Sequence, residues 1–187
     1  MARLEPLRPD HAPALLAFER ENRAYFAASI PDRGDAYFAD FDARHRELLA
    51  DQAAGLHLFH LVVDDTGTVL GRFNLVDVSG DSAELGYRVA ERAAGRGLAT
   101  TAVREVCALA ASAYGLTTLR AATTVDNTGS RTVLTRTGFL VTGTTELSGR
   151  PGLRFARDLS DAVPRSSRPD GDPAGQGIGS AAGLIGD

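Results

Sequence analysis

The pattern of apolar and polar positions predicts strands and helices that alternate along most of the chain. Alternating residues over Arg3–Leu7 predict a short first strand. Apolar residues at helical spacing predict helices over His11–Arg23 and Ala36–Ala53. Asp10 is a suitable N-cap for the first of these helices, and Gly55 is a suitable stop for the second.

The middle and the end of the chain add six strands and two helices. The segment Leu56–Glu91 predicts three strands, because the turn sequences Asp65–Gly67 and Ser79–Asp81 divide it. Leu98–Tyr114 has the clearest amphipathic pattern and predicts a helix. The remaining predicted elements are a strand, a short helix and two strands, over Thr118–Val125, Thr128–Thr137, Leu140–Glu146 and Gly152–Leu159. This order is typical of an α+β fold, with a mixed and mostly antiparallel sheet of six to seven strands flanked by four helices.

The last residues differ in composition from the rest. Residues 161–187 are rich in Gly, Pro, Ser and Asp and nearly free of bulky apolar side chains. Such a segment buries too little apolar surface to offset the entropy of ordering it. The sequence therefore predicts one globular domain over residues 1–160 and a disordered tail over residues 161–187.

The composition excludes several classes of protein. Cys107 is the only cysteine, which excludes a disulfide scaffold, and no His/Cys cluster has the spacing of a zinc site. No apolar run approaches the roughly 20 residues of a membrane span, and the N-terminus lacks an apolar signal-peptide core. No basic segment is interleaved with aromatic residues, as nucleic-acid binding favours. We therefore expect a cytoplasmic protein that binds no metal, membrane or nucleic acid.

Isolated reactive side chains carry less information. Cys107 lies within the predicted helix 98–114 and is expected to be a core thiol. His57 and His60 are three residues apart on a predicted strand, so they face opposite sides and do not form a metal pair. His45 is expected at the surface rather than in a substrate cleft.

The charges are unevenly distributed. All 20 basic residues are arginines, and the net charge of −4 divides into −7 over residues 1–91, +5 over 92–159 and −2 over 160–187. An acidic half followed by a basic half favours two kinds of ligand, one cationic and one anionic. The alternative is an uneven composition without functional meaning.

The segment Arg92–Ala99 is the most informative motif. It follows a predicted strand and opens the clearest helix of the chain. Gly95 and Gly97 allow a tight turn that presents consecutive backbone N–H groups, while the helix N-terminus, Arg92 and Arg96 add positive charge. This pattern fits a pyrophosphate, although an ordinary strand-to-helix turn has similar residues. The segment is neither a Walker loop, since Gly-Lys-Ser/Thr is absent, nor a dinucleotide-binding fingerprint, since it comes late among strands that look antiparallel.

Arg92-x-x-Gly95-x-Gly97 resembles the acetyl-coenzyme A signature of the GNAT superfamily of N-acetyltransferases. Further segments resemble its RimJ/RimL branch: Glu21–Arg23, Leu70–Leu75, Glu84–Tyr87, Asn127-x-x-Ser130-Arg131 and Gly138-Phe139. The resemblance covers roughly residues 2–159. It implies the GNAT fold, in which two strands, here ending near Val89 and beginning near Thr118, splay apart and hold acetyl-CoA between them.

The resemblance also implies which residues meet the cofactor. The pyrophosphate is expected on the loop 92–97, the pantetheine arm at Asn127 and the 3′-phosphate at Arg131. The expected cofactor-binding residues are Tyr87, Arg88, Val89, Arg92, Gly95, Arg96, Gly97, Leu98, Ala99, Asn127, Ser130 and Arg131. Structural roles stay open beside these, because Asn127 is a natural N-cap and Ser130 suits the first turn of a helix.

Glu84 and Ser130 are the expected catalytic residues. Several family members place a general base where Glu84 lies, and a structural hydrogen bond is the alternative role. Ser130 would protonate the leaving thiolate; many members carry a Tyr for this at a position that is Leu134 here, so a thiolate leaving without a dedicated acid stays an alternative. The expected acceptor-binding residues are Asn22, Arg23, Phe26, Asn74 and Glu84.

The resemblance implies an enzyme that moves acetyl from acetyl-CoA to a primary amine by direct attack in a ternary complex. The favoured acceptor is a protein or peptide N-terminal α-amine. A small-molecule amine, as in antibiotic self-resistance or metabolite tailoring, is one alternative. A non-catalytic CoA-binding or scaffold protein on the same fold is another, and the resemblance also leaves room for a homodimer.

Overall fold

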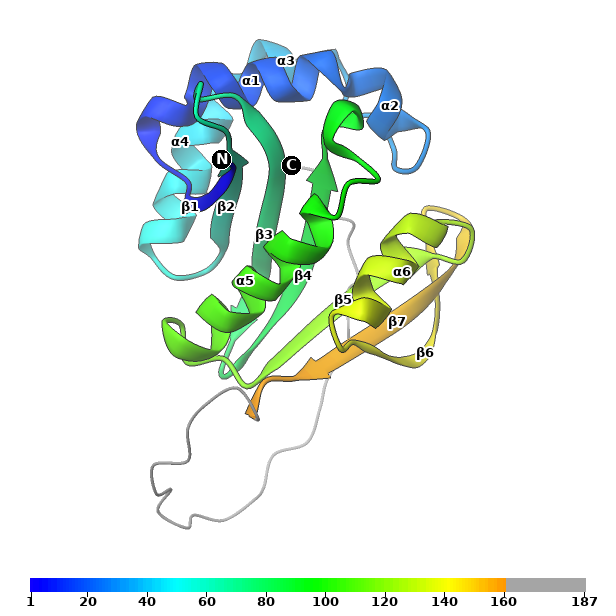
Figure 1. Cartoon of the computed structure of the whole chain (residues 1–187). Coiled ribbons are helices and arrows are strands. Elements are labelled where there is room, and N and C mark those ends of the chain that lie inside the picture. Colours follow the sequence, from blue (N-terminus) through cyan, green and yellow to red (C-terminus); the bar gives the residue numbers. More distant parts are fainter. Residues whose placement is uncertain (161–187) are drawn as a thin grey trace.

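The computed structural model describes residues 1–160, which form one seven-stranded sheet in the order β1-β2-β3-β4-β5-β7-β6 (Figure 1). The strands are β1 (Arg3–Pro6), β2 (Leu58–Val63), β3 (Val69–Ser79), β4 (Ser82–Val89), β5 (Thr118–Thr124), β6 (Leu140–Leu147) and β7 (Arg150–Asp158). Neighbouring strands are antiparallel except β4 and β5, which are parallel. The predicted mixed α+β sheet is confirmed.

Within residues 1–160 six helices flank the sheet, and the prediction of four is corrected because both predicted N-terminal helices are broken. The helices are α1 (Ala12–Glu21), α2 (Arg23–Ala27), α3 (Asp35–Ala39), α4 (Phe41–Ala53), α5 (Leu98–Ser112) and α6 (Thr128–Arg136). The first break falls at Asn22, whose side-chain amide donates to the carbonyl of Phe18 and competes with the helical ladder. The second falls at Asp40, a weak helix former with non-helical backbone angles. Asp10 lies inside a short 3-10 turn, Pro9–His11, and is not the N-cap that the sequence predicted.

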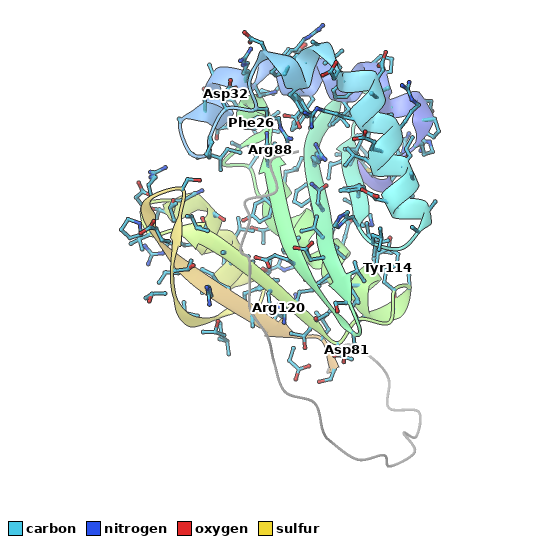
Figure 2. The ribbon with its side chains drawn as sticks, turned by 180° about the vertical axis from the view of Figure 1, so that it is seen from behind. Phe26, Asp32, Asp81, Arg88, Tyr114 and Arg120 are labelled. Atoms are coloured by element: carbon cyan, nitrogen blue, oxygen red, sulfur yellow. The ribbon has the colours of Figure 1, made fainter. Side chains whose placement is uncertain are left out.

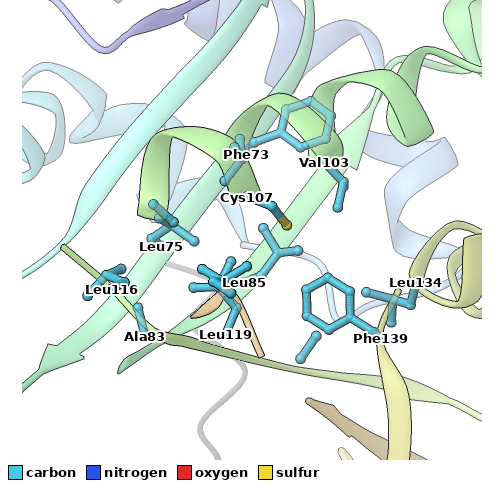
Figure 3. Packing of buried hydrophobic residues seen from close by; sticks show 14 of the residues in the cluster. Phe73, Leu75, Ala83, Leu85, Val103, Cys107, Leu116, Leu119, Leu134 and Phe139 are labelled. Atoms are coloured by element: carbon cyan, nitrogen blue, oxygen red, sulfur yellow. The ribbon is translucent and has the colours of Figure 1, made fainter. Parts of the chain in front are cut away.

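The helices cover opposite faces of the sheet. On β2, Phe59, Leu61 and Val63 pack with α1–α4, whereas Val62 packs with α5, as the alternation of a strand requires. The core beneath α5 and α6 is seen in Figure 3, where Cys107 lies among apolar side chains. Cys107 is buried, and burial raises the pKa of its thiol, so the predicted core thiol is confirmed.

His45 and His60 are buried in polar contacts. The prediction of a surface position for His45 is wrong, because Nε2 of its ring lies 3.1 Å from the carbonyl oxygen of Arg8 and the ring stacks on Phe41. The ring of His60 lies between the carbonyl of Phe73 and the hydroxyl of Tyr114. Burial lowers the pKa of both histidines.

The predicted tail, 161–187, lies outside the described residues. Within residues 1–160 no helix has the length and apolar character that a membrane span needs. The same part of the chain gathers no group of three or more His, Cys, Asp or Glu side chains suited to a metal ion.

Candidate active site

The divergence of β4 from β5 creates the site. The two strands pair only through Ser82–Glu84 with Thr118–Arg120 and then separate, as Figure 1 shows. Beyond that point β4 pairs only with β3, and β5 pairs only with β7. Each strand therefore turns an unpaired backbone edge toward the space between them. The predicted splayed strand pair is confirmed.

Polar contacts fix the closed end of this divergence. The backbone N–H of Thr117 donates to the carbonyl of Asp81 at 2.7 Å, and its hydroxyl donates to the Asp81 carboxylate at 2.5 Å. Arg120 donates to the hydroxyl of Ser82 at 3.1 Å. Figure 2 places Asp81 and Arg120 at this end, with Arg88 and Phe26 toward the other.

Two cavities occupy the open end. The first cavity, of about 410 Å³, lies on the face that carries Asn74 and Glu84, and the second, of about 460 Å³, extends to the start of α5. Residues of β4 and α6 line both. The shared lining consists of Ser29, Ile30, Tyr87, Arg88, Asn127 and Ser130. A ligand in one cavity can therefore meet a ligand in the other beside these residues.

The glycine-rich loop lines the second cavity. Gly95 and Gly97 have φ angles of 70° and 80°, a region that disfavours other residues, and Gly97 is the N-cap of α5. No atom lies within 4 Å of the position that a Cβ would take on either glycine. The predicted cofactor residues that line this cavity are Tyr87, Arg88, Val89, Gly95, Gly97, Leu98, Ala99, Asn127 and Ser130. The loop thus offers an open backbone surface at a helix N-terminus, which fits a pyrophosphate.

Three predicted cofactor arginines lie outside this cavity. Arg92 and Arg96 are exposed on the loop, and Arg131 donates to the carbonyl of Val125 at 2.9 Å. Arg136, which sequence reasoning missed, lines the cavity instead. Helical spacing could have revealed Arg136. It shares the face of α6 that meets the cavity with Gly129, Thr132 and Val133.

A hydroxyl pair lies where the cavities meet. Asn127 caps α6 through a 3.1 Å hydrogen bond from the backbone N–H of Ser130, as its N-cap role predicted. Ser130 Oγ lies 3.1 Å from the hydroxyl of Tyr87, a contact that the sequence did not reveal. Burial raises the pKa of Tyr87 to about 12, with the Ser130 hydrogen bond opposing, so the phenol is protonated at neutral pH. Leu134 is buried close by and offers no polar group.

Glu84 supplies a carboxylate to the first cavity. Its side chain lines the first cavity and is half-buried. Within residues 1–160 it makes no hydrogen bond and no ion pair. On β4 it lies opposite Val76 of β3 and Arg120 of β5. A carboxylate without a structural partner in a cavity is available to accept a proton.

The predicted acceptor residues divide into two groups. Asn74 lines the first cavity, and Phe26 lines the second, beneath the guanidinium of Arg88 at 4.9 Å. Asn22 and Arg23 line neither. Asn22 Oδ1 accepts the backbone N–H of Glu91 at 2.9 Å, which ties α1 to the segment before the glycine-rich loop. Arg23 forms ion pairs at 2.6 Å and 2.7 Å, and its partners are Asp32 and Asp35.

A buried ion cluster forms one wall of the first cavity. Glu19 of α1 lies 3.0 Å from Arg88, 3.3 Å from Arg72 and 3.6 Å from Arg33. Arg72 and Arg88 are directly opposite on β3 and β4. Burial lowers the pKa of Arg88 to about 10, since the Glu19 carboxylate only partly offsets burial and the two nearby arginines. We call Arg33, Arg72 and Arg88 the arginine cluster.

Comparison with known proteins identifies the family. The family model described as an acetyltransferase (GNAT) domain matches residues 2–140. No curated protein sequence matches the chain.

Solved structures share the fold at low sequence identity. Ribosomal-protein-S5-alanine acetyltransferase from Vibrio fischeri has a TM-score of 0.81 at 19% identity, over 87% of this chain and 96% of that one. RimJ from Mycobacterium smegmatis, in complex with CoA-disulfide, has a TM-score of 0.77 at 24% identity, over 88% and 85%. A mutant of spermidine N-acetyltransferase SpeG from Vibrio cholerae has a TM-score of 0.70 at 15% identity, over 89% and 98%.

The family match spans most of the domain, and the glycine-rich loop and the splayed strands lie where the motifs predicted them. That match counts against the alternative of a non-catalytic scaffold. The chain belongs to the GNAT acetyltransferase family and is an acetyl-CoA-dependent N-acetyltransferase.

Proposed function

We propose that this enzyme acetylates the N-terminal α-amine of a protein or peptide by direct attack on acetyl-CoA. One observation carries the proposal: the two cavities meet beside Tyr87, Asn127 and Ser130. An amine in the first cavity can therefore reach an acyl group that enters through the second. Holding both reactants in one site supplies much of the rate enhancement of such a transfer.

In the second cavity, backbone groups would make more of the contacts with coenzyme A than side chains would. The open surface of Gly95 and Gly97 at the start of α5 would hold the pyrophosphate, and Arg136 would add positive charge. The unpaired edge of β4 would receive the amide groups of the pantetheine arm. When bound, acetyl-CoA supplies the activated acetyl thioester.

Glu84 is the proposed general base. Only a neutral amine attacks a carbonyl carbon, so a proton has to leave the acceptor ammonium. The Glu84 carboxylate lines the acceptor cavity and lacks a structural partner within residues 1–160, which supports this role over the structural alternative. It would take the proton directly or through one water molecule.

Ser130 is the proposed acid. As the bond from carbon to nitrogen forms and the bond from carbon to sulfur breaks, the leaving thiolate needs a proton. Tyr87 can donate its hydrogen bond to Ser130 Oγ, which leaves the serine proton free to point toward the sulfur. The phenol, protonated at neutral pH, then passes its proton to the serine and regains one from solvent, which closes the proton balance.

The rim of the first cavity supports a peptide acceptor. Exposed residues of two loops form this rim, Ser29 and Pro31 on one side and Ser148 on the other, so the rest of a chain has a path out. Arg150 joins the two sides by donating to the carbonyl of Ser29 at 3.2 Å. The structural neighbour named as a ribosomal-protein-S5-alanine acetyltransferase adds support at the level of the fold. We further propose that residues 1–160 suffice for this activity and that it takes place in the cytoplasm.

An acceptor screen tests the proposal. Peptides that begin with Ala or Ser, polyamines, aminoglycosides and free amino acids are each incubated with acetyl-CoA, and release of the CoA thiol is followed. We expect the peptides to be the best acceptors, with mass spectrometry placing the acetyl group on the α-amine. Turnover of only small amines would refute the peptide assignment and leave the family activity intact.

A further inference from the structure

Gly71, near the start of β3, makes room for an aromatic ring because it has no side chain. A Cβ at this position would lie 2.8 Å from Cε2 of Phe73, 3.5 Å from Cζ of the same ring and 3.3 Å from the carbonyl oxygen of Arg88. The first distance is too short for two carbon atoms in contact. Phe73 is fully buried, so its ring has no open space into which it could turn. The ring of Phe73 thus occupies the place that a side chain at position 71 would take.

The backbone of β3 does not itself require glycine at this position. A β-bulge lies beside Gly71, since Val62 pairs with Gly71 and Val63 pairs with Val69, and glycine is common at bulges. In the type of bulge that depends on glycine, this residue has a left-handed conformation. The glycines with a positive φ within residues 1–160 do not include Gly71. The space beside its Cα is therefore what distinguishes this position.

The ring that fills this space supports Tyr87. Phe73 and Tyr87 are directly opposite on β3 and β4, and their rings stack with an interplanar angle of 11°. Within residues 1–160, β4 has no strand partner on its other side at Tyr87, because its pairing with β5 ends at Glu84. The Tyr87 hydroxyl extends toward that open side and lies 3.1 Å from Ser130 Oγ. The ring of Phe73 is therefore the support that the sheet gives to the Tyr87 side chain.

We infer that Gly71 is a positioning residue for acetyl transfer, because its bare Cα lets the Phe73 ring lie where it holds the Tyr87 hydroxyl beside Ser130. The inference rests on the proposed role of Tyr87 and Ser130 in proton donation to the thiolate. Gly71 lines neither of the two cavities and acts only through the two stacked rings. A misplacement of about 1 Å in a reacting group can cost about a hundredfold in rate, so a small shift of these rings is sufficient.

Alanine at position 71 tests the inference. The new Cβ does not fit beside the present ring, so the Phe73 ring has to tilt and the stacked ring of Tyr87 moves with it. We expect Gly71→Ala to lower kcat about tenfold or more, with little change in the affinity for acetyl-CoA measured by calorimetric titration. Gly143→Ala on β6 is the matched control and should keep the wild-type kcat. A Cβ there has no atom of residues 1–160 within 4 Å, and the φ of Gly143 is not left-handed.

The same substitution in a Tyr87→Phe background separates positioning from a general loss of structure. Tyr87→Phe keeps a ring that can stack but lacks the hydroxyl, so Gly71→Ala has no hydroxyl left to misplace. We expect Gly71→Ala to lower kcat in the wild-type background and to leave it nearly unchanged in the Tyr87→Phe background. A loss of equal size in both backgrounds, or a wild-type kcat for folded Gly71→Ala, would overturn the inference.

A relief variant covers the case in which Gly71→Ala does not fold. Leucine at position 73 lacks the Cε2 and Cζ atoms that conflict with the new Cβ, so Gly71→Ala/Phe73→Leu should melt at a higher temperature than Gly71→Ala. Its kcat should stay low, because no ring supports Tyr87. Phe73→Leu alone should show the same loss of kcat. Recovery of kcat together with the melting temperature, or a wild-type kcat for Phe73→Leu, would reduce Gly71 to a packing residue and overturn the inference.

The choice of acceptor keeps this test apart from the peptide assignment. A peptide that begins with Ala is the acceptor, and the best small amine of the acceptor screen replaces it if no peptide is acetylated. Turnover of small amines alone would refute the peptide assignment, while the effect of Gly71→Ala on kcat would still test the inference. A wild-type kcat for Tyr87→Phe would refute the proposed proton donor and the inference with it.

Discussion

The hydroxyl of Tyr87 on β4 lies 3.1 Å from Ser130 Oγ on α6, and so spans the divergence between the two halves of the sheet. The Asn127 cap holds Ser130 in that position. The ring of Tyr87 stacks on the ring of Phe73 with centroids 5.5 Å apart, and this contact holds Tyr87 in position. Two rigid elements thus present a hydroxyl pair to both cavities.

Removal of either hydroxyl should slow acetyl transfer. We expect Tyr87→Phe and Ser130→Ala each to lower kcat about ten- to a hundredfold, because proton donation to the thiolate loses its donor or its orientation. The kcat of the double variant should be little lower than that of either single variant, because each substitution already disables the same proton-donating pair. Tyr114→Phe, which loses a hydroxyl bonded to His60, is the control for stability. Additive losses would show that the two hydroxyls act separately.

Glu84→Gln should change the pH dependence of the rate. An N-terminal α-amine has a pKa of about 7.7–8.0, so a base matters most below that range, where the acceptor is an ammonium. We expect a loss of about a hundredfold at neutral pH and below, which narrows above pH 8 or so. The melting temperature should not change, because the side chain has no partner to lose within residues 1–160. A pH–rate profile parallel to that of wild type would show that Glu84 takes no part in proton transfer. Glu105→Gln, at an exposed position of α5, is the matched control.

Gly97→Glu should abolish binding of acetyl-CoA. The substitution places a carboxylate at the N-terminus of α5, where we expect the pyrophosphate, at a φ of 80°. Gly67→Glu is a close control, because that glycine has a φ of 83° and open space around it in a distant turn. Both variants should lose about 1 kcal/mol of stability from backbone strain. Calorimetric titration with acetyl-CoA should show wild-type affinity for the control alone; equal affinities would place the pyrophosphate elsewhere.

Glu19→Gln should destabilise the fold strongly. The substitution removes the carboxylate that lies among three buried guanidinium groups. Loss of one partner from a buried ion pair costs about 3–5 kcal/mol. Urea denaturation measures the change in the free energy of unfolding, with Glu105→Gln as the exposed control. A loss no larger than that of the control would mean that the cluster does not need its carboxylate.

Stability should decrease below pH 6.5 or so because of the buried histidines. Burial lowers the pKa of His45 and His60 in the folded state. Above the unfolded-state pKa of about 6.5, both states are neutral and the histidines add no pH dependence. Below it the unfolded chain binds protons first, so the free energy of unfolding falls until the folded-state pKa is reached. Denaturation curves at several pH values give the free energy of unfolding as a function of pH, and the slope of this function below pH 6.5 or so should be shallower for His60→Gln than for wild type. An identical slope would exclude His60 as a source of the pH dependence.

Local patterns predicted the parts of the site that depend on neighbours in sequence. The turn at Gly95 and Gly97, the start of α5 and the cap at Asn127 each need only a few consecutive residues. The arginine cluster was invisible because Glu19 and Arg72 are 53 positions apart, and only the packing of α1 on β3 brings them together. The same limit explains His45, which is buried through its contact with Arg8, 37 positions away.

The position of Arg136 escaped the sequence analysis for another reason, and the contact of Arg131 with the cofactor stays a prediction. Arg131 and Arg136 both lie on a short helix, and motif spacing alone favoured the first. The side chain of Arg131 instead turns back to the carbonyl of Val125, which a sequence pattern does not reveal. The position of Arg136 follows from the face that α6 presents to the second cavity.

The brief pairing of β4 with β5 has a consequence for solubility. Leu85–Val89 and Ala121–Thr124 each keep a row of backbone groups without a strand partner in the interior of the sheet. Unpaired edges are templates on which a second chain can add a strand, and most sheets confine them to their rims. The two edges face one another, and we expect bound acetyl-CoA to cover them and so to protect the protein from aggregation. Supply of acetyl-CoA would then govern how much of the protein stays in solution, besides how fast it works.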